Sequence, residues 1–177
     1  MNRRALRTAL VTLGLCTLAA CIVNLSFDMP QTFTVQTASG VKSLSQTQHV
    51  VLSSYKEIND HKNNIKSLDL DSADVTVTKV YSDNAATVLT GSVQLKKNAA
   101  DLTETPVVVG QLTNFPLTLN STVRLPGSPA IDAFLLQQLQ SAGSFDVIID
   151  GSINSAPAHL DLTVLMHASL GYDTGLF

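Results

Sequence analysis

Short serine, lysine and aspartate motifs are the first places in this sequence to look for covalent chemistry. Ser53-Ser54-Tyr55-Lys56 and Ser39-Gly40-Val41-Lys42 have the Ser-x-x-Lys spacing that lets a lysine activate a serine, and Ser82-Asp83-Asn84 is the triplet that accompanies it in penicillin-interacting enzymes. Those enzymes also need a Lys-Thr-Gly strand and a large helical domain, and this chain has neither. We interpret the motifs as a helix cap and a hairpin turn.

The triplet Asp173-Thr174-Gly175 has the composition of the site at which two aspartates share a proton in aspartic proteases. In that family the triplet lies well inside the fold. Here Leu176 and Phe177 alone follow it in the printed sequence. We interpret it as a terminal segment without catalytic chemistry.

Carboxylates and histidines recur at spacings that invite a metal hypothesis. Asp69, Asp71 and Asp74 could offer oxygen ligands, but an EF-hand loop opened by Asp69 would need glycine at Asp74 and glutamate at Val80. His159, Asp161 and His167 share the outer face of one predicted strand, with His167 ~27 Å farther along. Because nothing in the sequence nominates a further ligand, we expect no metal site and no cofactor.

The first 20 residues have the pattern of a secretory leader. Arg3, Arg4 and Arg7 are its only charged residues, and an apolar run from about residue 9 to residue 20 follows them. A helix that crosses ~30 Å of hydrocarbon needs roughly 20 predominantly apolar residues. This run is shorter and is interrupted by threonine, glycine and cysteine, which favours a cleaved leader over a spanning anchor.

The end of that run, Leu18-Ala19-Ala20-Cys21, resembles the lipobox of bacterial lipoprotein precursors. The resemblance covers residues 1–21. It implies cleavage before Cys21, a diacylglyceryl thioether on the cysteine sulfur and, usually, an amino terminus acylated by a fatty acid such as palmitate. In that family an aspartate after the cysteine favours the inner membrane, so Ile22 implies an outer-membrane lipoprotein, with the periplasmic or surface side left open. An uncleaved anchor and an ordinary secretory leader are the alternatives.

Removal of residues 1–20 leaves a mildly acidic chain of 157 residues. Its basic residues fall from 11 to 8 against 14 acidic ones, a formal charge of −6, and no basic run is present. That balance argues against nucleic acid as a partner. Cys21 becomes the only thiol, so no internal disulfide can form and stability must come from a packed core.

Most of the mature chain alternates apolar and polar residues with the period of a β-strand. Leu70 and Ala73 lie out of phase if both face a core, which predicts a bulge near Ser72. Pro30 predicts a break, and Pro116 an edge strand or a strand start. The expected strands are residues 23–29 and 33–35, a short strand within a polar connection over 39–48, a hairpin over 68–96, two strands after residue 106, and a final pair over 145–149 and 160–170.

Two segments change to helical periodicity. In residues 53–68, Ser54 and Glu57 have the spacing of a capping box, and apolar residues follow one stripe as far as Leu68. Over residues 128–142, Ser128 is the expected N-cap and Pro129 the first helical residue. The apolar face of this second helix is Ile131, Phe134, Leu135, Leu139 and Ala142, and Gly143 is the expected stop.

Together these patterns predict one mainly β (α+β) domain over residues 21–177, either an antiparallel β-sandwich or a curled open sheet with two short helices. Since no catalytic set is present, we expect a membrane-anchored envelope lipoprotein that is not an enzyme. It would act as a structural or adaptor module for an envelope protein partner. The alternative is a carrier or sensor of an apolar ligand such as a lipid, held between the sheet and the 128–142 helix. That alternative depends on the long apolar face of the last strand and a mean hydropathy of +0.21.

Overall fold

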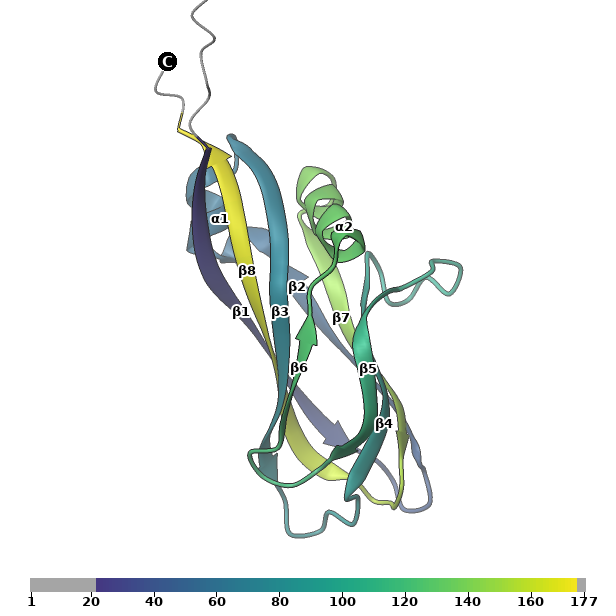
Figure 1. The fold of residues 1–177 in the computed structure, drawn as a ribbon. Coiled ribbons are helices and arrows are strands. Elements are labelled where there is room, and N and C mark those ends of the chain that lie inside the picture. Colours follow the sequence, from purple (N-terminus) through teal and green to yellow (C-terminus); the bar gives the residue numbers. More distant parts are fainter. Residues whose placement is uncertain (1–21, 175–177) are drawn as a thin grey trace, which may run out of the picture.

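The computed structural model describes residues 22–174, which form eight antiparallel strands in two four-stranded sheets (Figure 1). One sheet has the order β1-β8-β3-β6 and the other the order β2-β7-β4-β5. The strands are β1 Ile22–Gln36, β2 Ser43–Val51, β3 Ile65–Val80, β4 Val88–Lys96, β5 Val107–Pro116, β6 Thr122–Pro126, β7 Ser144–Ile153 and β8 His159–Asp173.

The strand order is that of a jelly-roll sandwich. Only β4 and β5 are both consecutive in the chain and adjacent in a sheet, because every other connection crosses between the two sheets. This double-sheet arrangement of eight strands is the jelly-roll pattern. The predicted mainly β architecture with two helices is therefore confirmed, and of the two predicted forms the sandwich is the one that occurs.

Alternate residues of the strands build one buried apolar cluster between the sheets. The alternation runs from Phe27 to the end of β1 and from His159 to Leu170 on β8, with Phe33 and Val164 among the residues that solvent barely reaches. Each fully buried side chain of this size contributes about 1.5–3 kcal/mol to the hydrophobic driving force. The core therefore explains how residues 22–174, which contain no cysteine, can be stable.

Because successive strands run in opposite directions, their connections gather at two ends of the molecule (Figure 1). The first residue of β1 and the last of β8 lie at one end, together with the connections 52–64 and 127–143, which carry the helices; we call this the terminal end. The connection 97–106 projects from the side of the sandwich, beside β5 and below α2 (Figure 1). Four loops, residues 37–42, 81–87, 117–121 and 154–158, form the loop end.

The helix α2 (Pro129–Gln140) confirms the second helical prediction. The Ser128 side chain accepts a hydrogen bond from the Ile131 N–H, and Pro129 occupies the first turn. Ile131 and Leu135 are fully buried, while Ala142 is exposed and lies past the end of the helix. Gly143 adopts φ of 68°, the left-handed conformation that glycine tolerates after a helix.

The helix predicted over residues 53–68 is wrong in most of its length. A short 3-10 turn, η1 (Leu52–Ser54), and a six-residue helix, α1 (Lys56–His61), are followed by β3. Ser54 donates its hydroxyl to the Val51 carbonyl, so the capping box does not form. Leu68 pairs instead with Leu170 of β8, because sheet pairing and burial outweigh the helical stripe.

The predicted hairpin over residues 68–96 is also wrong, since β3 and β4 belong to different sheets. Pro30 does not interrupt β1, which continues through it and pairs it with Leu165. Because β1 has a neighbour on one side only, the missing N–H of Pro30 costs no sheet hydrogen bond if it faces the free edge. Residues 43–51 form a full strand, longer than expected. Pro116 is the last residue of β5, so the predicted edge strand is confirmed and the alternative of a strand start is wrong.

The predicted bulge in β3 is confirmed by a register shift between Leu70 and Ser72. On the other side of β3 the pairing with β6 ends at Ser72, and Asp132 of α2 accepts the Leu70 N–H at 2.9 Å. Gly127 packs directly on this bulge. The contact is so close that a side chain at this position would clash with the Leu70 carbonyl oxygen. The bulge, Gly127 and α2 thus form one structural unit.

Candidate functional site

Cys21, the predicted lipid attachment residue, lies outside the described residues, but its neighbour does not. Ile22 is the first residue of β1 and pairs with Asp173, and Val23 pairs with Tyr172. The predicted signal segment, residues 1–20, also lies outside the described residues. The described residues therefore begin with a strand that is paired in its sheet from Ile22 onward, directly after Cys21.

The large apolar residues exposed in residues 22–174 lie at the two ends of the sandwich and around the loop 97–106. The most exposed is Leu102, at 94%, on this projecting loop, and Val108 follows it on β5. The terminal end carries Ile22, Val23 and Val51, and the loop end carries Val41, Val80 and Leu119. These three places hold the exposed apolar surface of the described residues.

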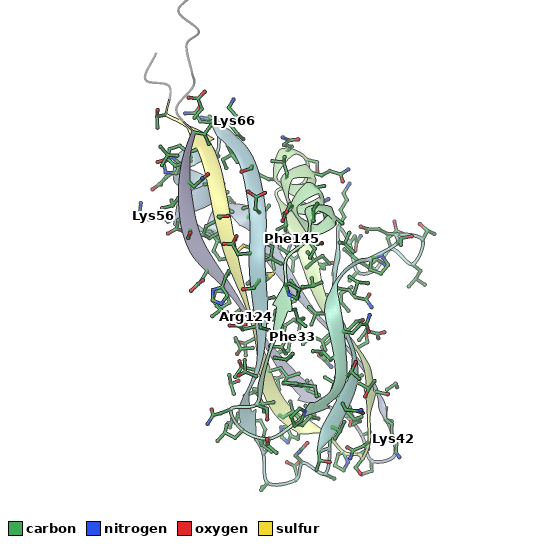
Figure 2. The ribbon with its side chains drawn as sticks, in the orientation of Figure 1. Phe33, Lys42, Lys56, Lys66, Arg124 and Phe145 are labelled. Atoms are coloured by element: carbon green, nitrogen blue, oxygen red, sulfur yellow. The ribbon has the colours of Figure 1, made fainter. Side chains whose placement is uncertain are left out.

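A row of alternating charges crosses the outer face of the β1-β8-β3-β6 sheet. His167 of β8 places Nδ1 2.7 Å from Oδ1 of Asp28 on β1 and Nε2 3.3 Å from Oδ2 of Asp74 on β3. Arg124 of β6, labelled in Figure 2, donates from Nε and Nη2 to the two oxygens of Asp74, both at 2.7 Å. One polar network thus joins all four strands of this sheet.

The charged groups in this row shift one another's pKa values. The hydrogen bond from Arg124, aided by His167, lowers the pKa of Asp74 to about 2. The hydrogen bond to Asp28 is the largest cause of a raised pKa at His167, against a smaller effect of burial. The imidazole can donate from both nitrogens only when it is protonated, so this network is complete in the cationic form.

A second row on the same face consists of threonines in register. Thr32, Thr163, Thr76 and Thr122 stand opposite one another on β1, β8, β3 and β6. The Thr76 and Thr122 hydroxyl oxygens are 2.9 Å apart. Together the two rows make an outer face that is polar and carries both signs of charge.

The loop 97–106 between β4 and β5 is held in a defined shape by carboxylates. Asp146 of β7 accepts the Ala99 N–H at 2.6 Å and also contacts His49. Glu104 accepts the backbone N–H groups of residues 97 and 98, and the Lys96 ammonium donates to the Asp101 carbonyl. Leu102 is therefore exposed on an ordered loop.

The serine and lysine motifs are not assembled into a catalytic arrangement. Ser53 and Ser54 belong to the η1 turn, and Lys56 pairs with Asp60 one helical turn away. Asp83 accepts from the His159 ring at 2.7 Å, and the Asn84 side chain donates to the Ala86 carbonyl. Ser39 and Lys42 lie in the connection between β1 and β2.

The aspartates and histidines that the sequence offered as metal ligands do not form one cluster, although Asp74 and His167 meet in the charged row. Asp69, Asp71 and Asp74 lie along β3, and only Asp74 joins the charged row. His159 and His167 pair with different aspartates, while Asp161 receives the Tyr81 hydroxyl at 3.3 Å. Within residues 22–174 no group of three or more histidine, cysteine or acidic side chains could hold a metal ion.

The hydrogen-bonded histidines of the described chain contact carboxylates and not hydroxyl or thiol groups. Of the Asp-Thr-Gly triplet, Asp173 ends β8 opposite Ile22, Thr174 follows it, and Gly175 lies outside the described residues. No helix of the described residues has the length and apolar character needed to cross a membrane.

Sequence reasoning did not find the charged row or the threonine row. It recognised His167 and Asp74 as outward-facing residues, but not Asp28 or Arg124 as their partners. The outward position of each follows from the alternation along its strand. Which strands are neighbours depends on the jelly-roll order, and no local pattern in the sequence gives that order.

Comparisons with known proteins leave the family open. No protein-family model matches the chain, and no curated protein is similar to it in sequence. Among solved structures, the Nora virus structure is similar over the whole of this chain and 69% of its own, with 13% identity and a TM-score of 0.37. The decameric BFDV capsid protein matches 85% of this chain and 96% of its own at 11% identity and a TM-score of 0.35. Likeness at this level has no bearing on function, and the fold assignment depends on the strand order.

Proposed function

We propose that this protein is a cell-envelope lipoprotein, anchored through acylated Cys21, that serves as a non-catalytic structural or adaptor module. The observation that carries the proposal is the direct junction between the lipobox, Leu18 to Cys21, and the first strand of the sandwich. The leader ends where the folded domain begins, as expected when cleavage before Cys21 leaves the folded domain attached directly to the acylated residue.

The surface of the described chain supports an adaptor role. The outer face of the β1-β8-β3-β6 sheet is polar, and its charged groups satisfy one another in the Asp28 to Arg124 row. The large exposed apolar side chains of the described residues lie at the ends and around the loop 97–106. A protein partner would find apolar contacts at the loop end, around Val41 and Leu119.

The packing of α2 weighs against the alternative of an apolar ligand carrier. Phe134 lies edge-on to Phe145 of β7 with ring centroids 6.0 Å apart, and Ile131 and Leu135 are fully buried by the protein's own side chains. The apolar residues that would have lined a ligand site are thus occupied in packing α2 on the sandwich. We therefore favour the adaptor over the carrier.

Ile22 supports the outer membrane as the location, since the residue after the cysteine is not aspartate. The test is membrane fractionation of the precursor and of a Cys21→Ser variant, expressed in a bacterium with two membranes. We expect the wild-type protein in the outer-membrane fraction and the variant in an unprocessed or released form. Unchanged processing and fractionation of the variant would refute the proposal.

A further inference from the structure

Between Cys21 and the sandwich there is no length of chain for a flexible linker. Ile22 is already paired with Asp173, and Val23 with Tyr172. A flexible linker of ten residues has an end-to-end distance of roughly 18 Å and lets a domain tumble on its anchor. Direct attachment of the lipid to a paired strand removes that freedom, so the anchor fixes which end of the sandwich meets the membrane.

The segments next to this junction, which are α1, the start of β3 and the end of β8, are held in place by contacts with one another. The His61 ring of α1 stacks on the Tyr172 ring with centroids 3.7 Å apart, and the Asp173 N–H donates to the Asn64 carbonyl at 3.0 Å. Tyr172 also pairs with Ile65 at the start of β3. The turn between α1 and β3 is therefore held beside the first residues of β1.

The side chains at this end suit a lipid headgroup layer. Ile22 and Val23, the first two residues of β1, are exposed apolar residues at the terminal end, and Ile22 is 58% exposed. Lys62 and Lys66 are exposed beside the junction, and Figure 2 places Lys66 next to the ends of β1 and β8. Lysine can lay its aliphatic stem on an apolar layer while its ammonium group contacts phosphate.

We infer that the terminal end rests directly on the phospholipid headgroups, so that the sandwich stands end-on with the strands of the β1-β8-β3-β6 sheet running away from the bilayer. This orientation rests on the proposed acylation of Cys21. The 15 residues of β1 extend about 50 Å at the usual rise per residue. The loop end, with Val41 and Leu119, is then held about that far from the membrane and presented to a partner (Figure 1).

The experiment uses tryptophan fluorescence, because the chain contains no tryptophan and a single introduced one reports its own position. The precursor carrying either Asn63→Trp or Leu119→Trp is expressed in a bacterium, extracted from membranes and reconstituted in phosphatidylcholine vesicles with a spin label on the headgroup. Both positions are exposed, one at each end of the sandwich. Mass spectrometry of each sample measures the acyl groups on Cys21.

In acylated samples we expect the Asn63→Trp variant to lose most of its emission and the Leu119→Trp variant to keep it. Insertion of a ten-residue Gly/Ser linker between Cys21 and Ile22 should restore the emission of the Asn63→Trp variant without changing acylation. Equal quenching at the two positions, or quenching that survives the linker, would overturn the orientation alone. Absence of acyl mass on Cys21 would overturn the proposed function and the orientation together.

Discussion

The imidazole of His167 lies 2.7 Å from the carboxylate of Asp28, and this contact ties the last strand of the sandwich to the first. The same ring reaches Asp74 of β3, so one titratable group touches three strands. The first and last strands of the described residues are therefore joined by a His167–Asp28 contact whose strength depends on pH.

The pH dependence of stability follows from the direction of these shifts. The folded pKa of His167 is raised above 6.5, so its contribution is complete below that pH and is lost as pH rises through the raised pKa. The pKa of Asp74 is lowered from 3.8 to about 2, so its contribution is present above 3.8 and is lost as pH falls toward 2. The two windows overlap between 3.8 and 6.5, where we expect the network to stabilise the fold most.

Thermal unfolding of a His167→Gln variant tests this account. Since Asp28 is largely exposed, the pair contributes less than about 1 kcal/mol. We therefore expect the wild type to lose about 2 °C more in Tm than the variant between about pH 6 and pH 9. A Thr163→Ser variant, on the same face of the same strand but without a titratable group, should follow the wild type. Equal losses in wild type and His167→Gln would contradict the assigned role.

The core prediction concerns Phe145, which is fully buried and packs edge-on against Phe134. Phe145→Ala should lower the free energy of unfolding by about 3–5 kcal/mol, because it removes a large apolar side chain and leaves a cavity. Leu102→Ala is the matched control, since Leu102 is exposed on the loop 97–106 and should change stability by less than about 0.5 kcal/mol. Urea denaturation measures both, and similar losses would refute the packing described here.

The contact between Asp132 and the Leu70 N–H gives a third prediction. Asp132→Ala leaves the backbone donor at the β3 bulge without its acceptor, which should destabilise the protein by about 1–3 kcal/mol. Asp132→Asn keeps a carbonyl oxygen in reach and should retain most of the stability. Hydrogen exchange at the Leu70 amide should accelerate in the alanine variant and stay slow in the asparagine variant. Equal exchange in the two would show that Asp132 does not protect this amide.

The local features of the fold could be predicted from the sequence where a single segment decides them. The Ser128 cap, the α2 face and the phase slip near Ser72 each depend on a few neighbouring residues. The cap and the phase slip are confirmed, and the α2 face is confirmed except at Ala142. The error at residues 53–68 arose because Leu68 fits a helical stripe as well as a strand, and its partner Leu170 lies 102 residues away. The pairing of β1 with β8 also decides the charged row, so Asp28 and Arg124 could not be assigned before the strand order was known.

Mass spectrometry of the intact protein, extracted from bacterial membranes, tests most directly whether the folded chain begins at an acylated Cys21, as we propose. We expect a chain that starts at Cys21 and carries the added mass of a diacylglycerol, usually with a further fatty acyl group on the amino terminus. A chain that retains residues 1–20, starts at another residue or carries an unmodified Cys21 would contradict it.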